Sequence, residues 1–577
     1  MTPNSDTGRI AVRTHRFELV MDIAAGRAHV GVPGLDGAVF EWTGGLLLGP
    51  VFGRGRILVG RPTVVQQARM PDGGEEIVLR ALLSGGGNGW IENRVYSTVD
   101  RFVCTARYVL DVAHPVEHWQ VFGRDTELGL PSVHAFVGKG NKDLGGTTFP
   151  VENLDVSTAS HNFQLWNACP RLLFTDGRVT AALGGTTLAH DYGLELKTNA
   201  QGTAEHLRFN YGGPDAPHPG QANRVQTGPR LQVQFHSGRT ALQVQEAFTE
   251  SMRRDGIVAP HRYRPEHLPW RRPWYCTWAD QVLLAESLTG DADWKGQRKS
   301  NAVLTQDLVM RAANRIRDWD LNIGTIVVDA GWQDKRGDWE LDPDKFPDGR
   351  GMVDELHAMG FKVHFWWAAL QVEAGAKVLK REGFTYPLPG VDEHALDYTN
   401  PDVREYVAEK VDRWFSADPD GWDIDGLKLD WLCERIRPVR NPADPEWRGE
   451  ERQLTKMLEL FHEIAARHKP AFAICGQARN PHSANLNFLA GIPENFSDDL
   501  DFLSEALAPL KAWMPEWWIK AHCVYQPERV AEHIRRTRNL DPNAIPELGL
   551  VLPENMADQT LADVKTALAA PRLPRYG

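Results

Sequence analysis

The sequence predicts two domains, an antiparallel β-sandwich in residues 1–258 followed by a (β/α)8 TIM barrel in residues 259–577. Three observations predict them. The first part is rich in glycine and in short runs that alternate apolar and polar residues. The second part alternates apolar strands with amphipathic helices. Eight such strands are spread over roughly 285 residues, the number that a TIM barrel needs.

Period-two alternation marks the strands of the first domain, and Gly, Asn and Asp turns separate them. Residues 240–254 have helical spacing and are a candidate link between the two halves. Residues 260–273 are rich in proline and arginine, which favours a linker. The clearest alternating runs are Arg27–Val32, Glu76–Arg80, Phe102–Leu110 and Arg230–Phe235.

In the second domain, continuous apolar runs between amphipathic segments predict a parallel sheet that is covered on both faces. The predicted strands are Trp274–Trp278, Gly324–Asp329, Lys362–Trp367, Gly426–Asp430, Ala471–Cys475, Asn495–Asp499, Ile519–Val524 and Leu548–Leu552. The predicted helices are Leu304–Trp319, Gly351–Met359, Pro401–Phe415, Arg452–His468 and Pro527–Arg538.

Composition excludes several classes of partner. With 64 Lys and Arg against 76 Asp and Glu, the net charge is −12, which argues against a nucleic-acid or anionic-membrane partner. No apolar run approaches the ~18 residues of a membrane span. The first ten residues lack the pattern of a secretory signal, so a cytoplasmic location is expected. Six scattered cysteines without a CxxC motif predict reduced thiols and no zinc framework, and we expect no metal and no cofactor.

Three carboxylates fall at predicted strand ends, where the catalytic groups of a parallel barrel gather. They are Asp329, Asp430 and Asp498, after the second, fourth and sixth strands, and tryptophans lie nearby. An indole face can stack on the C–H face of a sugar. Glycoside cleavage needs one carboxylate that attacks the anomeric carbon and one carboxylic acid that protonates the leaving oxygen. The sequence therefore favours a glycoside-cleaving site.

Charge spacing suggests how the two roles are divided. Lys428 lies two residues before Asp430 and on the same strand face, so we expect it to lower the pKa of Asp430 and keep that carboxylate ionised. Asp498 adjoins Asp499, and their repulsion would raise the pKa of one of them, as a proton donor requires. The alternative is that strand-end aspartates cap helices, and we expect one of this pair to do so.

Between about residue 270 and residue 505, a set of short motifs occurs in an order that is typical of a protein family. The set resembles the retaining α-galactosidase clan, chiefly its melibiase and raffinose-synthase-like branch and more distantly its α-glucosidase/α-xylosidase branch. The motifs are Asp329-Ala-Gly-Trp332, Gly337-Asp338-Trp339, Asp344-Lys-Phe-Pro347, Met359-Gly360, Lys428-Leu-Asp430, Cys475-Gly476 and Ser497-Asp498.

The resemblance implies a sandwich before the barrel and a double-displacement mechanism that retains the anomeric configuration. By it, Asp430 is the nucleophile, and Asp498 rather than Asp499 is the acid/base. It also implies that Asp329 binds hydroxyls at C4 and C6 and that Lys428 binds ring hydroxyls. The other substrate-binding residues that we carry over are Trp278, Trp332 and Trp366 against the sugar ring, Cys475 and Arg479 toward C2, and Asp338 and Trp431 within the shared motifs.

Three departures leave the glycone open. Ala330 stands where the galactosidase branch has a second aspartate, and Ala368 and Ala369 stand where it often has a glutamate. The family's C-terminal β-domain is not expected here, because the predicted eighth strand ends at Leu552, close to the last residue. Since polar sites gain selectivity by pairing particular hydroxyls, galactose recognition does not follow from the clan.

We therefore expect a retaining, exo-acting α-glycoside hydrolase that acts on a small oligosaccharide or another α-glycoside. A transglycosidase on α-linked oligosaccharides and an enzyme of α-glucosidase or α-xylosidase specificity are the alternatives. A carbohydrate-binding protein without turnover is a third hypothesis, which the altered Ala330 and Ala368 positions motivate. A homo-oligomer is left open.

Overall fold

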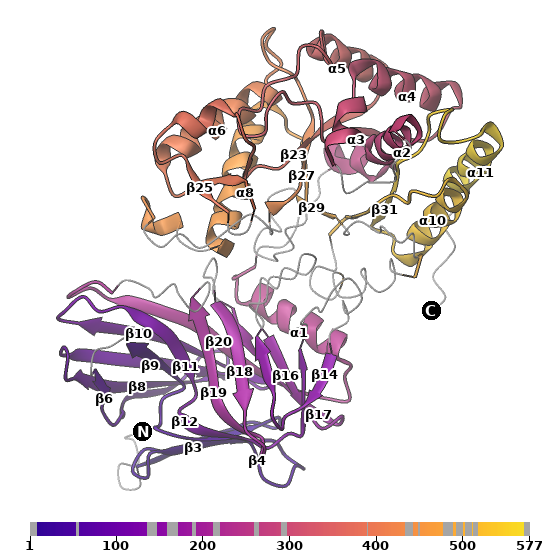
Figure 1. Cartoon of the computed structure of the whole chain (residues 1–577). Helices are drawn as coiled ribbons and strands as arrows, with labels where there is room; N and C mark the ends of the chain where they lie inside the picture. The colour runs from indigo at the N-terminus through magenta and orange to yellow at the C-terminus, as the bar shows by residue number, and fades with distance from the viewer. Residues whose placement is uncertain are drawn as a thin grey trace. The chain divides into compact units, whose positions relative to one another are not determined.

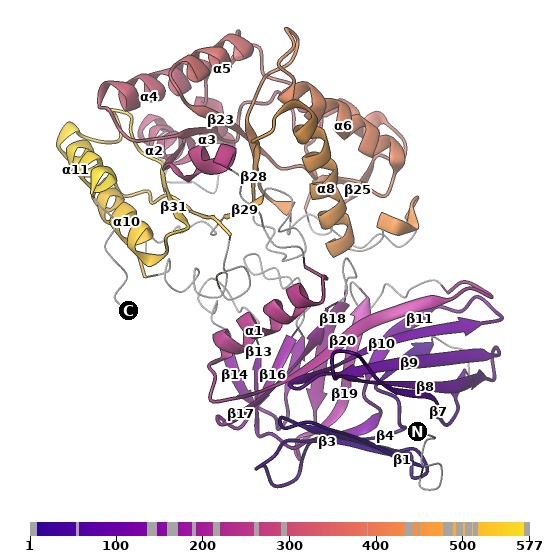
Figure 2. The ribbon, with the colours of Figure 1, turned by 180° about the vertical axis from the view of Figure 1, so that it is seen from behind.

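The chain divides into two compact units, one with Met1–Val258 and two short later pieces, the other with most of the chain from Ala259 onward. Figures 1 and 2 show the elements of each. The computed structural model describes residues 8–52, 57–135, 147–157, 171–186, 192–211, 220–258, 265–289, 297–388, 391–432, 442–447, 450–476, 488–491, 500–501, 511 and 517–570.

The first unit contains two ten-stranded antiparallel sheets. One has the order β1-β2-β3-β4-β12-β19-β11-β5, with β18 and β15 attached. Its strands are β1 (Arg9–Arg13), β2 (Glu18–Asp22), β3 (Arg27–Gly31), β4 (Ala38–Thr43), β5 (Leu48–Phe52), β11 (Val116–Val121), β12 (Arg124–Leu128), β15 (Asp155–Ser157), β18 (Tyr192–Thr198) and β19 (Thr203–Tyr211).

The other sheet has the order β14-β13-β16-β17-β20-β10-β9-β8-β6, and β7 pairs with β8. Three of the four alternating runs that the sequence predicts lie within strands of the two sheets, and the fourth, Arg27–Val32, runs one residue past the end of β3. The strands of this second sheet are β6 (Leu58–Val59), β7 (Thr63–Arg69), β8 (Glu75–Ser84), β9 (Gly89–Ser97), β10 (Arg101–Leu110), β13 (Ser132–Ala135), β14 (Thr147–Pro150), β16 (Arg171–Thr175), β17 (Val179–Gly185) and β20 (Gln226–Ser237).

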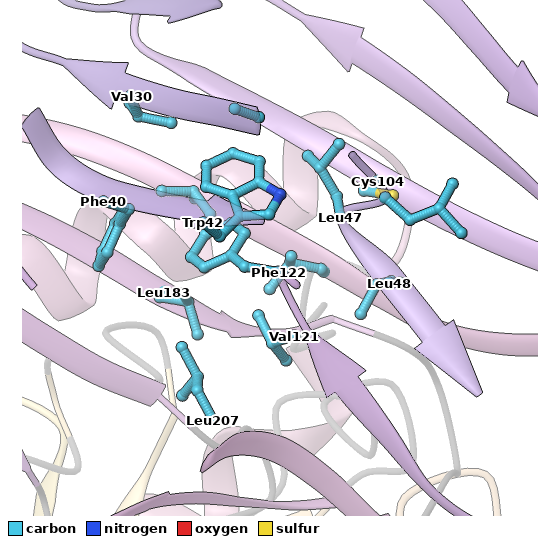
Figure 3. Packing of buried hydrophobic residues seen from close by; sticks show 14 of the residues in the cluster. Val30, Phe40, Trp42, Leu47, Leu48, Cys104, Val121, Phe122, Leu183 and Leu207 are labelled. Atoms are coloured by element: carbon cyan, nitrogen blue, oxygen red, sulfur yellow. The ribbon is translucent and has the colours of Figure 1, made fainter. Parts of the chain in front are cut away.

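One hydrophobic core draws on both sheets, because alternate residues of each strand point inward. Trp42 stacks on Phe122 with ring centroids 4.5 Å apart, and Figure 3 shows Leu47, Leu183 and Leu207 around them. Each such buried side chain contributes about 1.5–3 kcal/mol relative to an exposed one. The period-two pattern of the sequence thus arises because alternate side chains of each strand enter this core.

Helix α1 (Ala241–Arg254) closes the first unit and belongs to it. Thr240 and Gln243 form a capping box at its N-terminus, which explains why the helix starts there. Its buried face includes Phe248 and Met252, and the guanidinium of Arg171 lies 4.2 Å from the ring centre of Phe248. The helix therefore packs on the sandwich.

The second unit is a closed barrel of eight parallel strands, which confirms the predicted fold class. Every neighbouring pair is hydrogen-bonded, and β31 closes the barrel onto β21. The strands are β21 (Trp274–Cys276), β22 (Thr325–Val328), β23 (Lys362–Trp367), β27 (Gly426–Leu429), β28 (Ala473–Gly476), β29 (Phe488–Gly491), β30 (Ile519–Ala521) and β31 (Ala544–Leu548).

Capping residues set several helix starts around the barrel. The Thr305 side chain accepts the backbone N–H of Leu308 at the start of α4, and Asn400 precedes Pro401 at the start of α6. Figure 2 shows the helices outside the strands. They are α2 (Trp278–Thr289), α3 (Gln297–Val303), α4 (Gln306–Asp318), α5 (Gly349–Ala358), α6 (Pro401–Phe415), α8 (Glu450–His468), α10 (Pro527–Leu540) and α11 (Asp558–Ala569).

Three predicted strands are misplaced. The first ends at Cys276, and Trp278 begins helix α2 instead. The sixth barrel position is held by β29, so the predicted strand 495–499, outside the described residues, is not that strand. The eighth strand, 544–548, precedes the predicted 548–552, because its proline and its buried Glu547 disguise an otherwise apolar run.

Shorter elements complete the second unit. A three-stranded sheet, not predicted from the sequence, lies in the connection between β23 and α6, and the predicted linker contains the helix η1. Among the described residues, no helix combines the length and apolar character needed to cross a bilayer. These elements are β24 (Gln371–Val372), β25 (Thr385–Pro387) and β26 (His394–Leu396), and the 3-10 helices η1 (Pro265–Arg271), η2 (Lys377–Lys380) and η3 (Pro445–Trp447).

Candidate active site

The barrel brings predicted site residues from four strands to one end. Asp329 follows β22 directly, Trp366 lies near the end of β23, and Asp430 follows β27. The sheet register aligns Lys428 with Trp366 on one side and with Cys475 on the other. These side chains therefore lie around the carboxyl end of the strands, as the barrel geometry requires.

Lys428 and Asp329 form a buried ion pair, with Nζ 2.6 Å from Oδ2. The thiol of Cys276 joins them, since its Sγ lies 3.1 Å from Oδ2 of Asp329 and 3.7 Å from Nζ of Lys428. Burial by itself would lower the pKa of Lys428, but the acidic groups around it, Asp329 first and then others such as Glu547 and Asp430, together outweigh burial and hold that pKa well above its ordinary value. Lys428 is therefore a fixed cation in the barrel.

The direct partner of Lys428 differs from the expected one. We predicted a cation beside Asp430, and the structure instead pairs Lys428 with Asp329, while Asp430 contributes a weaker electrostatic attraction to Lys428. The reason is that the lysine side chain reaches across the interior to β22. Asp430 is bound by two N–H groups: Trp366 Nε1 donates to Oδ2 at 2.8 Å, and the backbone of Trp431 donates to Oδ1 at 2.9 Å. Both bonds favour the ionised carboxylate.

Two contacts fix the orientation of Asp329. Its backbone N–H donates to Oγ1 of Thr277 at 3.0 Å, and its Oδ1 accepts the N–H of Ala330 at 2.8 Å. Gln281 then holds the carbonyl of Ala330 at 2.9 Å. The carboxylate is thus held rigidly in place beside Lys428. Ala330 supplies only its backbone to this arrangement.

The neighbouring tryptophans at the end of β23 point to opposite faces of the strand. Trp366 donates to Asp430, whereas Trp367 packs under the helices, with its ring centre 4.9 Å from that of Trp414 on α6. Trp332 is fully buried against Trp414 and other aromatic rings, and its Nε1 donates to the carbonyl of Trp366 at 2.7 Å. The structure therefore places Trp332 in the core, and we leave it out of the sugar-binding set.

Asp338 and Trp278 also lie where they contribute to the fold. The carboxylate of Asp338 accepts the backbone N–H groups of Lys377 and Val378 at 2.8 and 3.0 Å, which caps η2. Trp278 is buried as the first residue of α2. The hydrogen bonds of the Asp338 carboxylate thus brace a loop, and neither residue is shown to join the group around Asp430.

Cys475 lies inside the barrel beside Lys428, and burial raises the pKa of its thiol to about 11. At neutral pH it is therefore a protonated, uncharged thiol. The described cysteines, Cys104, Cys276, Cys475 and Cys523, are all free and buried. The predicted acid/base Asp498, its neighbour Asp499 and the predicted Arg479 lie outside the described residues.

A second buried ion pair was missed from the sequence. Nζ of Lys520 on β30 lies 2.5 Å from Oε2 of Glu547 on β31, and the side chain of Glu547 is fully buried. Nε2 of His522 lies 3.8 Å from Oε1 of the same carboxylate. Burial would raise the pKa of Glu547, but Lys520, His522 and Lys428 lower it to about 2. The sequence feature that could have revealed this pair is a lysine and a glutamate within otherwise apolar strands.

Within the described residues, two groups have ligand atoms close enough to surround a metal ion. A lysine already contacts a carboxylate of each group: Lys520 binds Glu547 in the first, and Nζ of Lys469 lies 2.6 Å from the carboxylate of Asp423 in the second. Protein cations therefore already balance these carboxylates. The groups are His522, Cys523 and Glu547, and Asp354, His357 and Asp423.

Comparison with known proteins agrees with the barrel fold. Residues 295–477 match the model of the glycosyl hydrolases family 31 TIM-barrel domain. Over 191 residues the chain is 29% identical to the A type blood α-D-galactosamine galactosaminidase of Flavonifractor plautii, covering 30% of this chain and 16% of that protein. Over 134 residues it is 31% identical to the 1,3-α-isomaltosidase of Kribbella flavida, covering 18% of each.

The chain thus spans less than a fifth of the length of these two curated relatives. The fold matches over nearly the whole chain. A GH36 α-galactosidase from Geobacillus stearothermophilus superposes with a TM-score of 0.62 at 12% identity, covering 98% of this chain and 85% of that one. The family match and the fold match fall within one clan of α-glycosidases and do not single out a branch.

Proposed function

We propose that this protein is a retaining, exo-acting α-glycoside hydrolase in which Asp430 is the nucleophile and Asp498 the acid/base. One observation carries the proposal: the Asp430 carboxylate ends a barrel strand and accepts hydrogen bonds from Trp366 and from the Trp431 backbone. A nucleophilic carboxylate must be ionised and fixed in orientation, and these two N–H groups provide both. The family 31 match over residues 295–477 includes this strand.

In the first step a carboxylate oxygen of Asp430 attacks the anomeric carbon while the bond to the leaving oxygen breaks. Asp498 gives its proton to that oxygen, and a glycosyl ester on Asp430 forms. In the second step Asp498, now a carboxylate, takes a proton from water, and the resulting hydroxide attacks the anomeric carbon. The ester bond breaks and Asp430 is released. Two inversions retain the configuration.

The pair of Lys428 and Asp329 is suited to bind the hydroxyls of the glycone. An ammonium donates hydrogen bonds and a carboxylate accepts them, so together they can orient two hydroxyls of one sugar ring. Because their partners already fix them, little ordering is required when the sugar binds. We therefore propose a small oligosaccharide or another α-glycoside as the substrate.

A panel of substrates identifies the glycone. The galactosaminidase and the 1,3-α-isomaltosidase, by their names, act on different sugars, although both resemble this barrel. Nitrophenyl α-glycosides of galactose, N-acetylgalactosamine, glucose and xylose form the panel to test. NMR of the first-formed anomer checks retention: an α-anomer formed first supports the proposal, and a β-anomer contradicts it.

Variants assign the two carboxylates. Asp430→Asn should abolish turnover, and azide should restore it with an inverted glycosyl azide. Asp498→Asn should spare substrates with good leaving groups, and azide should then give the retained azide. Asp307→Asn, on an exposed side chain of α4, is the matched control and should behave as wild type. Undiminished hydrolysis by Asp430→Asn would refute the proposal.

A further inference from the structure

The guanidinium of Arg336 lies over the ring of Trp366, with Cζ 5.6 Å from the ring centroid. The same indole donates from Nε1 to Oδ2 of Asp430 at 2.8 Å. A cation, an aromatic ring and a carboxylate therefore form one chain of contacts. Arg336 belongs to the connection after β22, whereas Asp430 follows β27, 94 positions further along the sequence.

Arg336 is held firmly at this place. Its Nη1 donates to Oε1 of Gln371 at 3.1 Å, and Nε2 of Gln371 donates to Glu393 at 3.1 Å. The backbone carbonyl of Arg336 accepts the N–H of Glu373 at 3.2 Å. Arg336 is 7% exposed and Gln371 2%. The small sheet that holds Gln371 thus buries the cation against the indole.

We propose that Arg336 is a positioning residue for Asp430 and acts through the indole of Trp366. This inference rests on the proposed function, because it assigns a role in the attack by Asp430. Two physical effects support it. A cation over an indole face is attracted to the ring and fixes its plane. The same positive charge polarises the indole N–H, which makes it a better donor to an anionic acceptor.

Two cationic side chains of the described residues are relevant to Asp430, one on its own strand and one in the connection after β22. Lys428 on its own strand attracts it but is bound to Asp329 after β22. Arg336 approaches through Trp366, from the connection after β22. The ammonium of Lys428 is largely balanced by Asp329. On the side of Trp366, the positive charge comes from Arg336. Its loss should weaken the orientation of the Asp430 carboxylate and its preference for the ionised form.

The effect should fall on formation of the glycosyl-enzyme. Arg336→Met should lower the burst rate with an aryl α-glycoside about tenfold, the loss expected for one weakened hydrogen bond. KM should change little, since Arg336 is not proposed to touch the sugar. The acid limb of kcat/KM should move to higher pH, because Asp430 protonates more easily. Arg336→Lys should restore part of the rate and the position of the acid limb.

Trp366→Phe tests the route. It removes the N–H donor and should lose at least as much burst rate as Arg336→Met, and adding Arg336→Met to Trp366→Phe should lose nothing further, because both act on one contact. Fully additive losses, or a wild-type acid limb in Arg336→Met, would overturn the proposal. If Arg336→Met does not fold, Arg336→Gln is measured instead, and the same outcomes apply.

The matched control is Arg381→Met. Its guanidinium lies 3.7 Å from the ring centre of Phe384, a ring that is not part of the proposed site. It should leave the burst rate and the acid limb unchanged. The two proposals fail separately: an active Asp430→Asn refutes the proposed function. An inactive Asp430→Asn with a normal Arg336→Met refutes only the role of Arg336.

Discussion

Nζ of Lys428 lies 2.6 Å from Oδ2 of Asp329, and both side chains are almost fully buried. Lys428 is in β27 and Asp329 follows β22, so β23 separates the two strands. The pair therefore spans the barrel interior. Its charges are desolvated, and removal of one partner leaves the other uncompensated.

Asp329→Asn should lower kcat/KM about 10- to 100-fold, the loss expected when charge-assisted hydrogen bonds of 1.5–3 kcal/mol are removed. It should also create a basic limb. Asp329 makes the largest of the contributions that raise the pKa of Lys428 above its ordinary value, so Lys428 stays charged in the wild type, and without that carboxylate its pKa falls. The measurement is kcat/KM between pH 5 and 10. The exposed Asp344 in the same connection gives the control, Asp344→Asn, and an Asp329→Asn profile identical to that of the control would contradict the prediction.

Local signals predicted the elements that position the site. Strand β23 occupies the predicted residues 362–367. The prediction was possible because a strand of a parallel sheet is buried on both faces and forms an unbroken apolar run in the sequence. Helix α6 occupies the predicted residues 401–415, because Asn400 and Pro401 mark its start. Asp329 and Asp430 were found because a strand end is itself a local feature.

Partners across the barrel could not be predicted in the same way. The spacing of Lys428 and Asp430 shows that they share a strand face, but it cannot show that Asp329, 99 residues away, binds the lysine. Trp332 and Trp366 look equivalent as aromatic residues near strand ends. Only tertiary packing separates them, since one is enclosed by other aromatic rings and the other reaches Asp430.

The buried pair of Lys520 and Glu547 should matter for stability. Glu547→Gln leaves the Lys520 ammonium buried without its carboxylate and should cost about 3–5 kcal/mol of unfolding free energy. The double variant Lys520→Met with Glu547→Leu removes both charges and should lie much closer to wild type. Urea unfolding at pH 7 measures both. A double variant as unstable as Glu547→Gln would contradict this account.

The same pair sets a pH dependence. The folded-state pKa of Glu547, about 2, lies below its ordinary value of 4.5. Its contribution is therefore fully present above about pH 4.5 and is lost as the pH falls toward 2. The stability difference between wild type and Glu547→Gln should shrink over that range. An unchanged difference at pH 3 would show that Glu547 protonates alike in both states.

His364 should destabilise the fold in mild acid. It lies between Trp270 and Trp274, with ring centres 4.7 Å away, and burial lowers its pKa to about 3 from 6.5. Below pH 6.5 the imidazole of His364 binds a proton in the unfolded chain but not in the folded chain. The free energy of unfolding therefore falls as the pH falls from 6.5 toward 3, by up to about 1.4 kcal/mol per pH unit. His364→Leu should flatten this slope, measured by urea unfolding from pH 7 to 4.5. His15→Leu, at an exposed position, should keep it.

Gly426, the first residue of β27, should not tolerate a side chain. A Cβ there would lie 2.1 Å from Nε2 of His364 and 2.3 Å from the carbonyl oxygen of Ala473. Gly426→Ala should therefore destabilise the barrel by about 1–3 kcal/mol or more, as overpacking does, and shift the strand that carries Lys428 and Asp430. Thermal unfolding and kcat should both fall. Adding His364→Ala should rescue only part of the loss, because the Ala473 carbonyl belongs to the backbone. Gly31→Ala, where a Cβ meets nothing within 4 Å, is the control, and equal melting temperatures for the two glycine variants would contradict the prediction.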